Sequence, residues 1–229
     1  MKKTALGLMI ITVAAKIFGF VRDITLSYFY GVSYISDAYL ISLTIPMVIF
    51  EIIGTGIKTS YIPVYSLIKK EKGLNLANKF TNNTINFIIA ISSIVVVVVL
   101  LYTVPIVKLF AVGFEGSVLS LVVCFTKISI FAIYFYSLIY IFSGFLQMKN
   151  NFIVPAIMGI PLNFFIIIFI VISSKYNIVF LSIGTLIAVL AQLIFLIPFV
   201  YKKGYRYKFI LNMKDYYLKK MFFLAIPAI

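Results

Sequence analysis

The chain has 229 residues, of which 63% are hydrophobic and 11% charged, and its net charge is +14. A soluble domain carries about 25% charged and about 45–50% apolar residues, so this much apolar surface excludes a single soluble core. High hydrophobicity also excludes a disordered chain, and the single Cys124 excludes a disulfide scaffold.

The predicted elements are membrane-spanning helices, since about 20 apolar residues in a helix cross a ~30 Å hydrocarbon core. We expect an all-α polytopic membrane protein whose residues 1–201 form one lobe of six complete spans. The expected spans are 4–30, 34–67, 84–107, 117–148, 152–174 and 177–201. A basic cytoplasmic loop, 202–220, then leads to the start of a seventh helix, 221–229. Nine residues extend about 14 Å as a helix, so this element is expected to be cut short.

The first segment has an alternative interpretation as a cleaved signal peptide, because Lys2 and Lys3 precede an uncharged run, Thr4–Ala15. No small-x-small cleavage site precedes Lys16, and sequence typical of a helix continues to Tyr30. We therefore expect a retained span.

The basic residues predict the orientation. With six spans the loops alternate sides, and the other side of the membrane receives only Lys108 and Lys175. Fourteen basic residues share the side of the N-terminus: Lys2, Lys3, Lys69, Lys70, Lys72, Lys79, Lys149, Lys202, Lys203, Arg206, Lys208, Lys214, Lys219 and Lys220. Short loops rich in Lys and Arg remain in the cytoplasm, so we predict a cytoplasmic N-terminus. The positive charge then requires no nucleic acid as partner. Nearby tyrosines are expected to form an interfacial aromatic belt: Tyr201, Tyr205, Tyr207, Tyr216 and Tyr217.

Seven ionisable residues fall inside the predicted spans: Lys16, Arg22, Asp23, Asp37, Glu51, Lys58 and Lys127. A charge at the bilayer centre costs roughly 2.5–3.5 kcal/mol, so such residues usually face a bundle interior or a watery cavity. On the second span, polar residues recur every seven positions, which places them on one helix face. This predicted stripe consists of Asp37, Thr44, Glu51 and Lys58. Leu40, Ile41, Met47 and Val48 between them are expected to face lipid or packed helices.

Structural alternatives remain open for most of these charges. Asp37 and Lys58 lie near the ends of their span and could extend to the interfaces. Lys16 with Asp23, or Glu51 with Lys58, could be neutralising pairs, and Lys127 could pair with a helix outside this chain. Arg22 is the strongest site candidate, because its planar fork of donors is always charged and suits phosphate oxygens.

Catalysis is not expected. The chain has no histidine, which removes the commonest general base and metal ligand. No phosphate-binding glycine loop and no Cys/His cluster for a metal is found in the sequence. We predict a transporter without cofactor or metal, driven by an ion gradient or the membrane potential.

Several separated motifs stand out along the chain: Lys16-Ile-Phe-Gly-Phe-Val-Arg-Asp23, Gly31, Ser36-Asp37-Ala38-Tyr39, Ile45-Pro46, Gly144-Phe-Leu-Gln147, the stretch 155–163, and the stretch 192–207. Together these motifs resemble the MurJ/MviN lipid II flippase family. The resemblance implies membership of the multidrug/oligosaccharidyl-lipid/polysaccharide exporter superfamily, whose members place two six-helix lobes around a central cavity. It also implies an inner-membrane protein of bacterial cell-wall synthesis and cell shape.

The resemblance implies alternating-access transport of an undecaprenyl-pyrophosphate-linked peptidoglycan precursor. The partners it implies are membrane lipids and a missing C-terminal lobe. The resemblance implies basic residues at the positions of Lys16 and Arg22 and an aspartate at the position of Asp37. At the position of Lys16, arginine is usual in the family. Many members also carry an arginine where this chain has Phe50, beside Glu51; Lys58 is a possible substitute. The expected substrate-binding set is therefore Arg22, Lys16, Asp37, Asp23, Glu51 and Lys58.

Two alternatives to the lipid II flippase stay open. One is another exporter of the same superfamily, carrying a different lipid-linked oligosaccharide or a drug. A drug exporter would favour acidic cavity residues, whereas Lys16, Arg22, Lys58 and Lys127 outnumber the three carboxylates. The other is a non-transporting membrane scaffold, in which the intramembrane charges would pair within the chain.

Overall fold

Helices make up all the regular secondary structure of the described residues. The computed structural model describes the backbone of residues 2–225 and their side chains except those of 2–5, Ile53 and Lys58. The end of the expected seventh helix, 226–229, and the predicted site side chain of Lys58 therefore lie outside the described part. The helices are α1 (Lys2–Tyr30), α2 (Tyr34–Lys72), α3 (Leu74–Leu101), α4 (Thr103–Phe110), α5 (Gly116–Ser129), α6 (Ala132–Met148), α7 (Ile153–Ile157), α8 (Gly159–Lys175), α9 (Phe180–Lys202) and α10 (Tyr216–Ala225).

The all-helical, polytopic prediction is confirmed. Within the described part of the chain, four stretches are long and apolar enough to cross a membrane: Tyr34–Ile52, Leu74–Leu101, Ile153–Lys175 and Phe180–Lys202. A fifth is added if the bent pair α5 and α6 is counted as one span. α1 is not in this set. Among the residues whose side chains are described, every eighteen-residue stretch of α1 contains three charged residues: Lys16, Arg22 and Asp23. The count of six complete spans stays a prediction.

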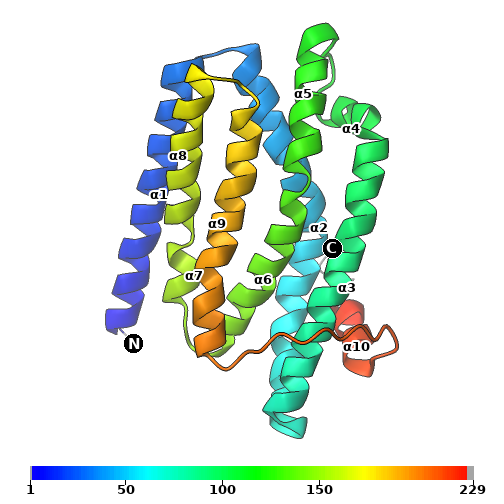
Figure 1. Cartoon of the computed structure of the whole chain (residues 1–229). Helices are drawn as coiled ribbons and strands as arrows, with labels where there is room; N and C mark the ends of the chain where they lie inside the picture. Colours follow the sequence, from blue (N-terminus) through cyan, green and yellow to red (C-terminus); the bar gives the residue numbers. More distant parts are fainter. Residues whose placement is uncertain (1, 226–229) are drawn as a thin grey trace.

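The long helices lie side by side and run up and down the molecule (Figure 1). α8 packs between α1 and α9, α9 packs on α6, and α2 packs on both α5 and α6. α1 and α2 touch little although they are consecutive in sequence. The lower end of Figure 1 holds the N-terminus, the α2–α3 turn, the α6–α7 turn and the segment 203–215. The basic loops of the sequence therefore gather at one end of the bundle.

α2 is the longest helix, at 39 residues, or about 58 Å at 1.5 Å per residue, and it continues through Pro46. A proline lacks the N–H that would bond the carbonyl four residues earlier, here that of Ser42. The hydroxyl of Ser129, at the end of α5, donates to the Ser42 carbonyl over 2.6 Å instead. The Ser42 carbonyl, which has no partner within α2, thus forms a hydrogen bond that links α2 to α5.

Several helix boundaries differ from the expected ones. α3 begins at Leu74, ten residues before the predicted start, because only Gly73, with φ of +84°, breaks the chain there. The predicted span 84–107 divides at Tyr102, since Pro105 cannot donate to the Leu101 carbonyl. The predicted span 117–148 bends by 43° between α5 and α6, where three-residue backbone bonds such as Phe131 N–H to Ile128 C=O tighten the chain.

The segment 203–215 is held against α3 by asparagine side chains, an arrangement we call the asparagine clamp (Asn82, Asn83 and Asn86). The Asn83 amide donates to the Asn212 carbonyl over 2.9 Å and accepts the Asn212 N–H over 2.7 Å. Asn86 donates to the Ile210 carbonyl over 2.9 Å, and Asn82 to the Arg206 carbonyl over 3.3 Å. The clamp fixes the path of the chain from α9 to α10, which begins five residues before the predicted start at Met221.

Candidate functional site

The main candidate site is a cavity of about 410 Å³ enclosed by α1, α2, α6, α8 and α9. Among its lining residues, two carry charge, Arg22 from α1 and Glu51 from α2. The wall is otherwise apolar apart from a few neutral polar side chains: Leu43, Met47, Phe50, Tyr136, Ile139, Tyr140, Met158, Leu162, Ile166, Thr185 and Gln192. We call this the upper cavity.

Small side chains position the α1 wall of the upper cavity. A Cβ on Gly159 would lie 3.1 Å from the Ala15 Cβ, and one on Gly19 would lie 3.7 Å from the Asn163 amide nitrogen. Ala15 and Gly19 are one turn apart on α1, as Gly159 and Asn163 are on α8. Small residues spaced in this way let helices approach closely inside a membrane. This contact sets the depth and rotation at which α1 presents Arg22, less than a turn beyond Gly19.

Arg22 forms an ion pair with its neighbour Asp23. Its Nε and Nη2 atoms donate to Asp23 Oδ1 over 2.9 and 2.8 Å, and this is the only ion pair within 4.0 Å among the described side chains. Asp23 is 60% exposed and Arg22 33% exposed. A guanidinium has five N–H donors, so Nη1 and one N–H of Nη2 stay free to bind an anion in the cavity.

On α2, an aromatic residue occupies the position where the resemblance led us to expect an arginine. Phe50 is buried, and its ring lies over Gly54, where an added Cβ would come within 2.7 Å of it. The Phe50 ring packs edge-on against Tyr140, with centroids 5.0 Å apart, and its centroid lies 6.0 Å from that of the tilted Tyr136 ring. The cationic cluster expected from the resemblance is therefore reduced here, and Phe50 orients two tyrosines of the wall instead.

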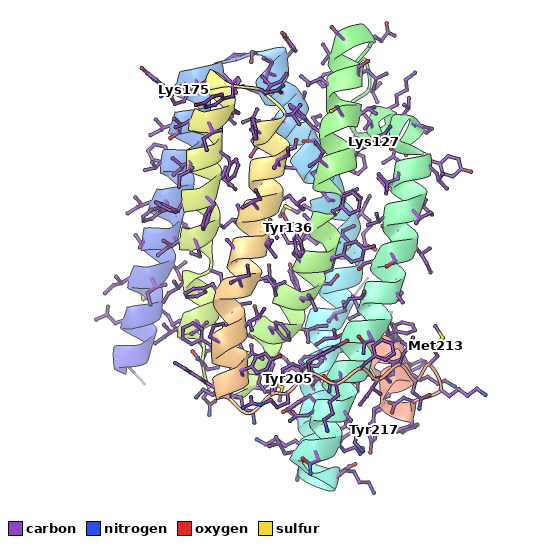
Figure 2. The ribbon with its side chains drawn as sticks, in the orientation of Figure 1. Lys127, Tyr136, Lys175, Tyr205, Met213 and Tyr217 are labelled. Carbon is purple, nitrogen blue, oxygen red and sulfur yellow. The ribbon has the colours of Figure 1, made fainter. Side chains whose placement is uncertain are left out.

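The structure brings only part of the predicted site together. Arg22 and Glu51 line the same cavity, and Asp23 joins them through its pair with Arg22. Lys16 and Asp37 are exposed and do not line the upper cavity. Met47, expected to face lipid or packed helices, lines it beside Glu51, because residues four apart share a helix face. Lys127 is exposed near the end of α5, in the upper half of Figure 2, without an ion pair among the described side chains.

The sequence reasoning missed the neutral polar residues of the cavity. Tyr136 lies at mid-height of the bundle (Figure 2), and Tyr140 follows one turn later. The Tyr39 hydroxyl bonds Thr185 Oγ1 over 2.7 Å, and the Gln192 amide donates to the Met158 carbonyl over 3.3 Å. The available signal was the spacing on α6, where Tyr136, Tyr140, Ser143 and Gln147 recur at helical intervals within an otherwise apolar run.

A second cavity of about 200 Å³ continues from the first toward the lower end of the bundle. Both are lined by Ile139, Tyr140 and Met158, and the second adds Ser143 and Gln147. We call this the lower cavity.

Positive charge lies just beyond the lower cavity. The Lys149 ammonium, two residues after Gln147, sits 5.5 Å from the centroid of the Phe145 ring. Partial burial, and then the charges of Lys69 and Lys203, lower the pKa of Lys149 below its usual range. Cations therefore crowd together at the end of α6, two residues beyond Gln147 of the lower cavity.

The groups that line these cavities can form hydrogen bonds and ion pairs with a ligand. No group of three or more metal-ligating side chains occurs among the described residues. The cavities combine one free guanidinium edge, carboxylates and neutral hydrogen-bonding groups inside a bundle of apolar helices. Such an arrangement is typical of helical membrane proteins that hold polar groups within the bilayer.

Comparisons with known proteins identify the family. A family model described as "Lipid II flippase MurJ" matches residues 26–229. A probable lipid II flippase MurJ of Buchnera aphidicola subsp. Baizongia pistaciae is 30% identical over 204 residues, covering 86% of this chain and 40% of the relative. The lipid II flippase MurJ of Thermosipho africanus is 32% identical over 199 residues, covering 86% and 41%. This chain belongs to the lipid II flippase MurJ family.

Solved structures agree with this assignment. A structure described as lipid II flippase MurJ in an inward closed conformation superposes with a TM-score of 0.79 and 27% identity, covering 96% of this chain and 46% of that one. An outward-facing multidrug resistance MATE family transporter of the MOP superfamily has a TM-score of 0.71 at 14% identity, covering 96% and 50%, which shows a shared fold alone. The chain spans about 40% of the length of the curated relatives it matches.

Proposed function

We propose that this chain is the N-terminal lobe of a flippase that moves a lipid-linked peptidoglycan precursor across the bacterial inner membrane. The observation that carries the proposal is the free edge of the Arg22 guanidinium in a cavity of a MurJ-family fold. A guanidinium binds pyrophosphate oxygens in a bidentate manner. Low dielectric in the cavity strengthens this attraction.

The proposed mechanism uses both charges of the upper cavity. Arg22 attracts the pyrophosphate and exchanges part of its contact with Asp23 for the substrate. Glu51, on the opposite wall, disfavours a second anion and helps to release the first. Rocking of two lobes around a central site is a general solution for transporters, so the lobe that completes the cavity is the essential partner.

We further propose that α1 is a span, which gives six crossings and a cytoplasmic N-terminus. The basic residues gather at the lower end of Figure 1, whereas Lys175 lies at the upper end. After replacement of Cys124, cysteines at Tyr34 and Glu115 should react with a membrane-impermeant thiol reagent in intact cells, and cysteines at Gly73 and Gly204 should not. The reverse labelling pattern would overturn the orientation.

The test of the proposed function is substitution of Arg22 in the full-length protein. Arg22→Ala should abolish complementation of a flippase-depleted strain, and Arg22→Lys should restore it only partly, because a lysine cannot bind two phosphate oxygens in a fork. Lys175→Ala, at an exposed site outside the cavities, is the control. Normal growth on Arg22→Ala, at membrane levels equal to the parent protein, would contradict the proposal.

Another exporter of lipid-linked saccharides is a second candidate, since the neutral polar groups of the cavities suit sugars of many kinds. Rescue of a strain that lacks a different lipid-linked saccharide exporter, without rescue of the flippase-depleted strain, would favour it.

A further inference from the structure

The side of α6 that faces the cavities carries four neutral polar residues, which we call the α6 polar stripe (Tyr136, Tyr140, Ser143 and Gln147). Tyr136 and Tyr140 line the upper cavity, and Tyr140, Ser143 and Gln147 line the lower one. The spacings of four, three and four residues place them on one helix face. The stripe therefore runs from the level of Arg22 and Glu51 to the cation-rich lower end.

The polar side-chain atoms of the stripe make few hydrogen bonds within the described part of the chain. Elsewhere in the chain, buried tyrosine hydroxyls bond protein partners, as Tyr39 does with Thr185 at 2.7 Å and Tyr61 with Thr81 at 2.9 Å. On the same helix, the Tyr134 hydroxyl donates to Ser93 over 3.1 Å. In the described part of the chain, neither the Tyr136 and Tyr140 hydroxyls nor the Gln147 amide has a side-chain hydrogen bond, and Ser143 reaches only the Met158 sulfur at 3.9 Å.

Open polar groups within a membrane need a partner. Leaving a polar group inside an apolar environment without a hydrogen bond is costly, and a saccharide supplies the hydroxyl and amide groups that would satisfy several of them. The Phe50 ring packs against both Tyr136 and Tyr140, which reduces the rotamer freedom that these tyrosines lose on binding. The stripe is thus a preorganised surface for a neutral, hydroxyl-rich group.

We propose that the α6 polar stripe is a subsite for the saccharide and amide head group of the substrate, separate from the Arg22 contact with pyrophosphate. The inference rests on the proposed function and adds a second recognition element to it. The head group passes along α6 while Arg22 holds the pyrophosphate. Discrimination between lipids that share a pyrophosphate then depends on neutral hydrogen bonds.

The experiment measures binding of two probes to the full-length protein in nanodiscs. One probe is a polyprenyl pyrophosphate that carries a saccharide-peptide head group, and the other is the bare polyprenyl pyrophosphate. Tyr136→Phe, Tyr140→Phe and Gln147→Met should each weaken binding of the first probe about threefold to tenfold, the worth of one neutral hydrogen bond. They should leave binding of the second unchanged. Tyr134→Phe, whose hydroxyl bonds Ser93 outside the cavities, is the matched control and should change neither.

Two results would overturn the subsite. One is an equal loss for both probes, and the other is a loss no larger than that of Tyr134→Phe. If Arg22→Ala still weakens both probes in that case, the proposed function stands and only the subsite fails. If the unsubstituted protein binds neither probe, the function and the subsite fall together. Unfolding temperatures equal to that of the parent protein establish that each variant is folded.

Discussion

Two regions of this molecule use polar side chains in opposite ways. At the lower end, Tyr205 is fully buried and its hydroxyl donates to Asn82 over 2.5 Å, within the asparagine clamp. Its burial raises the pKa of the Tyr205 hydroxyl well above its usual range. At mid-height, Tyr136 faces the upper cavity and has no hydrogen bond among the described residues. Figure 2 shows both tyrosines in one view.

The difference separates a structural role from a binding role. In the clamp, the amides of Asn83 and Asn86 use both their oxygen and nitrogen atoms within the chain. Nothing remains for a ligand, and the groups stabilise the path of residues 203–215. In the cavities, the Tyr136 and Tyr140 hydroxyls and one edge of the Arg22 guanidinium have no partner among the described residues, so they stay available to a ligand.

The largest stability effect is expected in the clamp. Asn83→Ala removes both bonds to Asn212 and leaves its backbone groups without partners, which should cost about 1–3 kcal/mol. Thermal unfolding in detergent should show a lower midpoint, and trypsin should cut faster at Lys208 and Lys214. Asn75→Ala, at an exposed site of α3, is the control. Unchanged cleavage in Asn83→Ala would show that the clamp does not hold the segment.

A smaller effect separates the two tyrosines directly. Tyr205→Phe removes a buried hydrogen bond and should lower the free energy of unfolding by about 0.5–1.5 kcal/mol. Tyr136→Phe removes a hydroxyl without a partner among the described residues and should not lower the free energy of unfolding. Both are measured by chemical or thermal unfolding of the same detergent-solubilised protein. Equal losses would mean that the Tyr136 hydroxyl is bonded within the protein, which contradicts an open cavity.

The helical class and the position of Arg22 beside a cavity were accessible from the sequence, because long apolar runs and charges within spans have few physical solutions. The clamp was not, since the asparagines at 82, 83 and 86 have their partners more than a hundred residues away. Tyr205 was assigned to an interfacial belt, but it is buried against Asn82. The break at Tyr102 depends on a single proline, Pro105, within a run that otherwise reads as a continuous span.

The predicted stripe on α2 shows the same limit. A period of seven places Asp37, Thr44 and Glu51 on one face, yet only Glu51 lines the upper cavity. Periodicity defines which residues share a face, but the neighbouring helices decide which part of that face is enclosed. Here α6, α8 and α9 enclose the middle of the bundle and leave Asp37 exposed near the upper turn.

We propose that a lipid-linked pyrophosphate occupies the upper cavity, and protection of a cysteine at Met47 is the sharpest test of this occupancy. In the full-length protein with Cys124→Ser, Met47→Cys should react with a water-soluble thiol reagent. The lipid-linked pyrophosphate should slow this reaction, and Arg22→Ala should remove the protection. Ile94→Cys, exposed on the apolar face of α3 outside both cavities, should stay unreactive in the membrane. Labelling of Met47→Cys at the same rate with and without the lipid would contradict the account.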